Sequence, residues 1–124
     1  LAKLEILNAF YHCGINDDGI RQCINLKSLN ASRNSKIINV NHLAKLEMLD
    51  AFGYCGINDT GIMGCINLKS LNASGNSKIT NVNHLVNLEI LDASGCCKIN
   101  DAGMVQCINL KSLNASNNSK ITKN

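Results

Sequence analysis

The sequence contains no proline and no tryptophan, and aromatic residues make up only 3% of its 124 positions. A core with so few rings must be built from leucine, isoleucine and alanine, as in folds made of repeated layers. No apolar run approaches the roughly 20 residues that a membrane-spanning helix needs, and no signal peptide is recognisable. We therefore expect no membrane partner.

The chain also carries little net charge of either sign. The 12 basic and 9 acidic residues leave a formal charge of +3, without runs of like charge. Nucleic-acid-binding domains carry a stronger basic excess, so we expect no nucleic-acid partner. Hydrophobic residues make up 45% of the chain, which is enough for a continuous core and excludes a disordered tail. The length and the lack of a Gly- or Pro-rich linker predict one domain over 1–124.

Metal-ligand spacings are absent, since neither Cys-x-x-Cys nor His-x₃-His occurs, and we expect no metal and no cofactor. The seven cysteines are an odd number. Two sets recur every 42 residues and are too far apart in a linear stack to form disulfides, so we predict small buried hydrophobic residues. Free thiols favour a reducing, cytoplasmic compartment. The two sets are Cys13, Cys55 and Cys97, and Cys23, Cys65 and Cys107. Of Cys96 and Cys97, only one side chain can face inward.

Internal repetition dominates the chain. Residues 43–84 match residues 1–42 at 33 of 42 positions, and residues 85–124 repeat the unit again. Within each unit the phrase L-x-x-L-x-A occurs twice, at alternating steps of 22 and 20 residues. The chain is therefore predicted to hold six coils, a long and a short one in each double repeat. The six phrases begin at Leu4, Leu26, Leu46, Leu68, Leu88 and Leu110.

These phrases resemble the leucine-rich repeat family over essentially the whole chain. The long coils read C-G-I-N-D-x-G-I at 13–20 and 55–62 and C-K-I-N-D-A-G-M at 97–104, and they resemble the cysteine-containing repeats of F-box proteins. The asparagine-rich short coils are similar to repeat proteins of large amoeba-infecting viruses. His12 and Tyr54 stand where the family pattern has Asn or Cys. The resemblance implies an interaction module that binds a protein on its concave face.

The spacing itself predicts an α/β solenoid, a horseshoe segment of six coils. Leu, Leu and Ala of each phrase point inward like alternate residues of a short strand, and identical segments stack as parallel strands. The sheet then forms the concave face. On the convex face, the stretch Asn16 to Ile20 predicts a short helical turn, because Asp before an apolar residue is a start signal. Residues 39–42 of the short coil leave room only for a 3₁₀ or extended turn.

Two sets of polar side chains are interpreted as structural. Asn34, Asn76 and Asn118 recur at the turn after the strand of each short coil, where their amides can pair backbone groups left open by the bend, so we predict a structural ladder. His42 and His84 each precede a core leucine and are predicted to bond a neighbouring backbone carbonyl. A further column alternates in sign and predicts cross-strand ion pairs: Glu5, Lys27, Glu47, Lys69, Glu89 and Lys111.

The exposed strand positions are the candidate partner-binding site, since apolar side chains on an open sheet often mark a protein interface. The candidate residues are Ile6, Phe10, Met48, Asp50, Phe52, Ile90 and Asp92. Every acidic residue occupies a repeated position, whereas catalysis needs unlike residues at one point, so we expect no catalytic residues and no enzyme.

Two functions from different classes remain open at this stage. The first is a protein–protein interaction module. The second is a structural or engineered self-assembling scaffold without a native ligand, which the high identity between units favours. The chain opens at Leu1, inside the repeat pattern, which we interpret as an excised, engineered or processed segment. Terminal coils without caps are expected to expose leucines and to associate end to end as a homo-oligomer.

Overall fold

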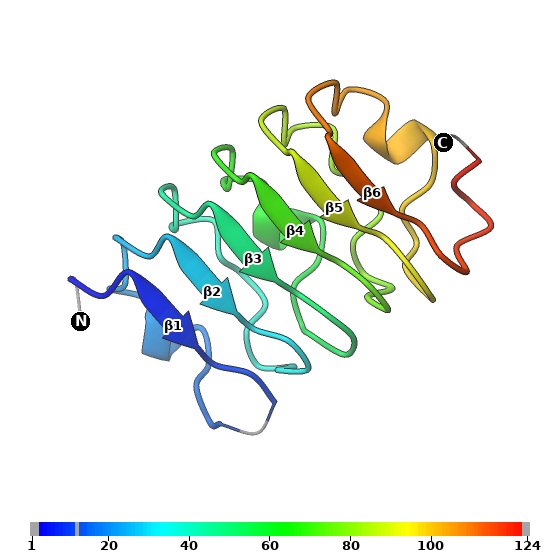
Figure 1. Ribbon diagram of the computed structural model, residues 1–124. Coiled ribbons are helices and arrows are strands. Elements are labelled where there is room, and N and C mark those ends of the chain that lie inside the picture. Colours follow the sequence, from blue (N-terminus) through cyan, green and yellow to red (C-terminus); the bar gives the residue numbers. More distant parts are fainter. Residues whose placement is uncertain (1–2, 12, 123–124) are drawn as a thin grey trace.

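The structure, a computed structural model, describes residues 3–11 and 13–122. Six three-residue strands lie side by side in chain order, and every neighbouring pair is parallel (Figure 1). The strands are β1 (Ile6–Asn8), β2 (Ser28–Asn30), β3 (Met48–Asp50), β4 (Ser70–Asn72), β5 (Ile90–Asp92) and β6 (Ser112–Asn114). The predicted solenoid of six stacked coils is confirmed.

The strands form because their central leucine faces a shared core. Leu29, Leu49 and Leu71 are at most 2% exposed, while the residues on either side of each point outward. Backbone hydrogen bonds continue beyond both ends of the strands, as when Ala31 N donates to Asp50 O at 2.8 Å. The backbone N–H and C=O groups of each coil therefore form their hydrogen bonds with neighbouring coils, which an isolated coil cannot provide.

The wall opposite the sheet carries short 3₁₀ turns in the long coils alone, as far as the described residues extend. They are η1 (Asp18–Ile20), η2 (Thr60–Ile62) and η3 (Ala102–Met104). The predicted helical turn is confirmed, and Asp17 stands directly before its first residue, but the side-chain bond to the turn comes from Asn16. Asn16 Oδ1 accepts the Gly19 N–H at 3.0 Å, and the Asp17 side chain makes no cap bond. Asp17 Oδ1 instead accepts the Ile38 N–H of the next coil at 2.9 Å. The aspartate therefore joins two coils.

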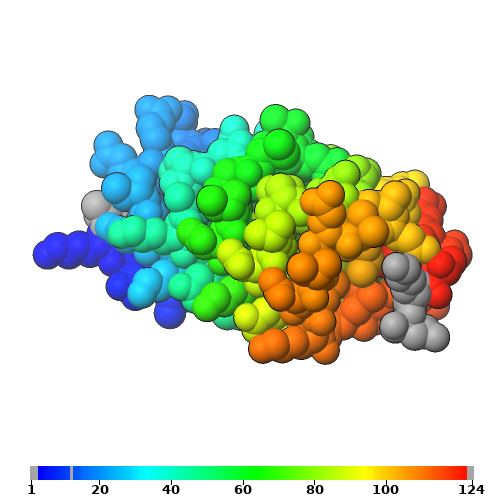
Figure 2. All heavy atoms as spheres, turned by 90° about the horizontal axis from the view of Figure 1, so that it is seen from above, coloured from blue at the N-terminus to red at the C-terminus, as the bar shows by residue number. Residues whose placement is uncertain are grey.

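The core runs along the whole axis of the stack, and successive coils follow one another as slabs in the space-filling view (Figure 2). Cys23, Cys55, Cys65, Cys97 and Cys107 are buried in it as free thiols, as predicted. The prediction fails for Cys13, which is exposed, because no preceding coil among the described residues packs over it. Cys96 is exposed beside buried Cys97, which confirms that one of the pair faces outward.

No helix within 3–11 and 13–122 has the length and apolar character needed to span a bilayer.

Candidate functional site

The sheet face carries the predicted apolar side chains, but it keeps them apart. Ile6, Met48 and Ile90 are 72%, 55% and 51% exposed. The register places a serine between each of them, because Ser28 lies opposite both Ile6 and Met48. Strands in a sheet are about 4.8 Å apart, so these apolar residues stand roughly 9.6 Å from one another. They lie along the sheet as separate exposed side chains and form no continuous apolar patch.

The strand-end carboxylates, Asp50 and Asp92, accept hydrogen bonds from backbone N–H groups. Asp50 Oδ1 accepts the Phe52 N–H and Asp92 Oδ1 accepts the Ser94 N–H, both at 3.1 Å. Asn30 makes the same bond to Ser32 at 3.0 Å. Burial, and to a smaller degree the charge of Asp92, raises the pKa of the Asp50 carboxyl, while the backbone bond opposes the shift. The sequence signal for such Asx turns is an Asn or Asp two residues before the bonded N–H, and it recurs at the end of these strands.

The three asparagines of the predicted ladder are buried, and each bonds two carbonyls of the preceding long coil. Asn76 Nδ2 donates to Ala51 O at 2.9 Å and to Ile57 O at 3.3 Å, and its Oδ1 accepts the Lys78 N–H at 2.8 Å. Asn34 and Asn118 make the equivalent bonds. Their amides are occupied by backbone groups, which leaves no polar atom directed at a ligand.

The remaining predicted polar contacts involve the histidines and the column of alternating charges. His42 Nε2 donates to Ile20 O at 2.9 Å and His84 Nε2 to Ile62 O at 3.0 Å, which confirms the predicted carbonyl bonds. His12 lies outside the described residues. Lys111 pairs with Glu89 at 3.5 Å, and Lys27 with Glu5 at 4.0 Å. These side chains are exposed, and such pairs contribute at most about 1 kcal/mol each.

The turns after the strands line one long edge of the sheet, at the arrowheads in Figure 1. We call this the strand-end edge and define it as the six segments that run from the alanine of each coil to the following isoleucine: 9–15, 31–37, 51–57, 73–79, 93–99 and 115–121. It contains five basic residues, Arg33, Lys36, Lys78, Lys98 and Lys120, and no acidic residue. The rest of the chain holds seven basic and nine acidic residues, a net charge of −2. The positive charge of the molecule is therefore concentrated on this edge.

Each turn has a left-handed residue at one equivalent place, and the first turn has a second such residue, Gly14. Six residues occupy the equivalent place. They are Tyr11, Arg33, Gly53, Gly75, Gly95 and Asn117. The three glycines follow one another in adjacent coils: a Cβ built on Gly75 would lie 3.6 Å from Gly53 Cα, and one on Gly95 would lie 3.8 Å from Gly75 N. Because no side chain fills this column between Arg33 and Asn117, the edge is hollowed at its middle.

A hollow of about 350 Å³ opens over Gly53 and Gly75. Its walls come from four successive coils: Arg33, Phe52 with Tyr54, Lys78, and Cys96. The Arg33 guanidinium carbon lies 5.1 Å from the centre of the Phe52 ring, within cation–π range. Tyr54 is 85% exposed. Of the predicted partner-binding residues the hollow gathers only Phe52, which is half-buried, and the ladder residue Asn76 also lines it.

Sequence reasoning missed Arg33, Tyr54 and Lys78. A signal was available for the first two, because positions 33 and 12 of the first unit are among the nine at which it differs from the second. Lys78 gave none, since lysine recurs in the short coils at 36, 78 and 120. Lys78 is distinguished only by the fold, which places it at the hollow.

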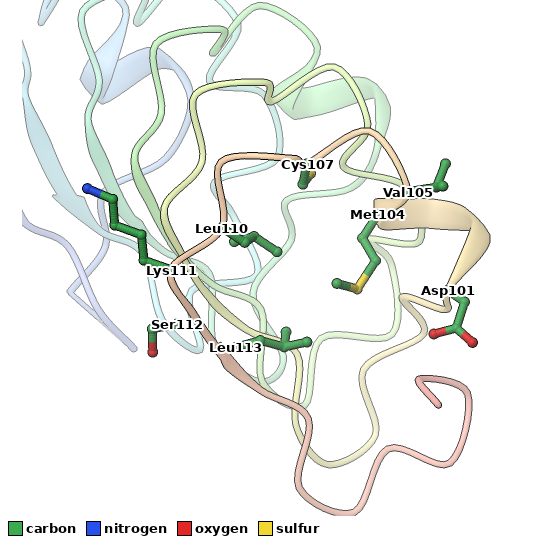
Figure 3. A pocket seen from close by; sticks show the side chains of 8 residues that line it. All are labelled: Asp101, Met104, Val105, Cys107, Leu110, Lys111, Ser112 and Leu113. Atoms are coloured by element: carbon green, nitrogen blue, oxygen red, sulfur yellow. The ribbon is translucent and has the colours of Figure 1, made fainter. Parts of the chain in front are cut away.

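A second hollow, of about 400 Å³, lies at the end of the core beyond β6 (Figure 3). Met104 and Leu113 border it, and Lys111 and Ser112 point away from it. Leu113 is partly exposed, whereas its equivalent Leu71 is 1% exposed. The open surface is therefore the same apolar layer that a following coil covers elsewhere in the stack.

Within the described ranges, no three His, Cys, Asp or Glu side chains lie close enough to hold a metal ion.

Comparisons with known proteins identify the fold. No protein-family model and no curated protein matches the sequence. Among solved structures, internalin C2 from Listeria monocytogenes superposes with a TM-score of 0.77 at 24% identity, over 98% of this chain and 55% of that one. An internalin of the same organism, inlF, gives 0.72 at 21% identity, over 99% of this chain and 37% of that one. The chain thus spans about half the length, or less, of these neighbours. The likeness establishes a leucine-rich-repeat solenoid.

Proposed function

We propose that this chain is a protein-binding module, not an enzyme, and that it binds its partner through the sheet face together with the strand-end edge. The observation that carries the proposal is the hollow at that edge. Arg33, Tyr54 and Lys78, three side chains of different chemistry, meet there on a surface that otherwise repeats itself. The leucine-rich-repeat fold supports the general role, because its stacked coils present an extended surface for binding.

The two parts of the surface are continuous. Phe10 is half exposed and begins the turn after β1, and Phe52 begins the turn after β3. Each ring lies two residues beyond its strand, between the exposed strand positions and the basic turns. Aromatic and arginine side chains account for much of the binding energy at protein interfaces. A partner seated on both parts would therefore cover Phe52 and Arg33 as well as Met48.

Affinity capture with purified variants tests the proposal. The wild-type chain and the Met48→Ser/Ile90→Ser variant are used as bait in a cell extract, and bound proteins are quantified by mass spectrometry. The control, Ile66→Ser/Ile108→Ser, removes two exposed side chains, 53% and 83% exposed, that precede β4 and β6. We expect a partner that wild type and control retain and that the sheet-face variant loses. Identical captures by all three baits would contradict the proposal.

The second candidate, a self-assembling scaffold, is favoured by the open core beyond β6. In the 124-residue chain this layer is complementary to the first coil, because a long coil follows a short one at every such junction of the stack. We also propose a reducing, cytoplasmic location, which the seven free thiols support. The buried thiols Cys55 and Cys97 support the assignment of the long coils to the cysteine-containing repeat type.

A further inference from the structure

We propose that the glycine-floored hollow of the strand-end edge binds an acidic peptide segment of the partner protein. This inference rests on the proposed protein-binding function and adds the chemistry of the ligand. Three independent features carry it: the sign of the charge on the edge, the exposed backbone of the floor, and the arginine and aromatic side chains of the wall.

Charge selects an acidic ligand. Arg33 and Lys78 both line the hollow, and both are exposed. The five basic residues of the strand-end edge face no carboxylate within its six segments. Coulomb repulsion among them is relieved when an anionic side chain enters, and guanidinium and ammonium groups are the donors that bind carboxylates most strongly.

The floor selects an extended chain. Gly53 and Gly75 form the floor, and Cys96 of the next coil lines its far end, so the hollow crosses three coils from Gly53 to Cys96, about 10 Å at 4.8 Å per coil. An extended peptide advances about 3.3 Å per residue, and three residues span that length. Because the floor has no side chains, a peptide can approach its backbone closely. The hollow of about 350 Å³ falls at the small end of the range of ligand pockets.

Arg33 is prepared for this role before a ligand arrives. Its φ of 57° is left-handed, a conformation that a non-glycine residue adopts at a cost of about 1–2 kcal/mol. The side chain then runs over Gly53, with its Cγ 3.4 Å from the Cβ position of that glycine, and reaches Phe52. Tyr11 and Asn117 share this conformation, so the strain belongs to the turn, and Arg33 is distinguished by the glycine and the aromatic ring that its side chain meets. Stacking on Phe52 fixes the guanidinium at the rim of the hollow.

A nucleic acid fits the edge less well. The sequence pI is about 8.5, and the surface away from the strand-end edge is net acidic. A phosphate chain longer than the hollow would run onto β3 and β5, which end in Asp50 and Asp92. Repulsion from Asp50 and Asp92 grows with the charge of the ligand, and a phosphate at every nucleotide brings more negative charge near them than one or two carboxylates on a short peptide.

Binding of defined peptides by fluorescence anisotropy tests the proposal. The probes are fluorescein-labelled octapeptides with zero, two or four glutamates among alanine, serine and tyrosine, and the same peptides with glutamine in place of glutamate. A labelled 20-nucleotide oligothymidine is the second probe. We expect affinity to rise with the number of glutamates, to fall at least tenfold on replacement by glutamine, and to fall with added salt.

Three variants locate the site. Arg33→Asn removes the charge but introduces the residue that Asn117 supplies at the same left-handed position, so the turn is preserved. Lys78→Gln removes the second charge of the hollow. Lys69→Gln removes an equal charge just before β4, away from the hollow. We expect the first two to weaken acidic-peptide binding at least fivefold and the third to change it less than twofold, with unchanged circular dichroism melts.

The outcomes separate this inference from the proposed function. If the glutamate peptides fail to bind, or bind Arg33→Asn as well as wild type, the acidic-segment assignment is overturned, while partner capture by the wild-type chain still supports the module. Oligothymidine binding that is tighter than peptide binding and is lost in Arg33→Asn also overturns it, in favour of a nucleic-acid site. If the wild-type chain captures no partner, the failure lies with the proposed function.

Discussion

Single buried side chains hold each turn of this solenoid in place. Asn76 ends one coil's turn and bonds two carbonyls of the preceding coil, while its own oxygen accepts a backbone N–H. Without that amide, backbone groups in the dry interior lose their partners, and each unsatisfied group costs about 1–3 kcal/mol. The ladder of asparagines is therefore part of the core although its members are polar.

Replacing Asn76 with alanine should lower the free energy of unfolding by about 3 kcal/mol, since two carbonyls and one N–H lose their bonds. Asn67 is the matched control. It also donates to an alanine carbonyl of the preceding coil, Ala44 O at 2.9 Å, but it is exposed and water can replace it. Asn67→Ala should cost less than about 1 kcal/mol. Urea unfolding measures both, and equal losses would show that the ladder is dispensable.

The buried thiols predict how stability depends on pH. Burial raises the pKa of Cys55 and of Cys65 from 9.0 to about 11. The folded state then keeps these protons in a range where the unfolded chain releases them. The contribution is complete below pH 9 and is lost as the pH rises through 11. The melting temperature should therefore fall between pH 9 and 11, and it should fall less in Cys55→Ala/Cys65→Ala. Parallel curves for the two proteins would contradict the assignment.

At the scale of the element, the contact between coils depends on positions without side chains. A Cβ on Gly61 would lie 2.0 Å from Ile38 O of the preceding coil, which is far inside contact distance. Gly19 holds the same position in the first coil, where a Cβ meets only side-chain atoms, the nearer being Ile15 Cγ2 at 3.3 Å. Gly61 and Gly19 are therefore equivalent glycines, one packed against a preceding coil and the other in the first coil that the structure describes.

Gly61→Ala should destabilise the protein by about 3 kcal/mol, because the backbone of the preceding coil must move to admit the methyl group. Gly19→Ala should be tolerated within about 0.5 kcal/mol. Thermal unfolding of the two variants makes the comparison. A similar effect at both positions would mean that the coils do not pack as closely as described.

Strands and 3₁₀ turns follow directly from the sequence, whereas the contacts between coils do not. The period of L-x-x-L-x-A places a leucine at the centre of every strand, because inward alternation leaves no other register. Asp17 was assigned to its own turn because local rules reach only a few residues, but its partner, Ile38, is 21 residues away. The hollow was missed for the same reason, since Arg33 and Tyr54 meet only after the glycines between them open the column.

At the scale of the whole molecule, the open core beyond β6 supports the proposal that copies of the 124-residue chain associate end to end. Lys111 and Ala115 hold the positions of Lys27 and Ala31, which bond the next long coil through Lys27 O and Ala31 N. Glu5 and Asn8 hold the positions of the groups that those atoms meet in that coil. The first coil of a second copy can therefore continue the sheet.

The 124-residue chain should accordingly dimerise or form short oligomers in sedimentation experiments. Leu110→Lys places a charge at the open layer and should yield a monomer. The control is Ile108→Lys, which changes a side chain that is already 83% exposed and should leave association unchanged. A wild-type chain that remains monomeric over a wide concentration range would rule out end-to-end assembly.

All of these expectations depend on parallel coils stacked in register, and engineered disulfides test that arrangement most directly. With exposed Cys13 and Cys96 changed to serine, Ser28→Cys/Met48→Cys joins register partners on β2 and β3, about 4.8 Å apart. Ser28→Cys/Ser70→Cys joins positions two strands apart, beyond the reach of a disulfide. Under mild oxidation, mass spectrometry should find the bond in the first variant and not in the second. A bond in the second variant, or in neither, would contradict the stacked solenoid.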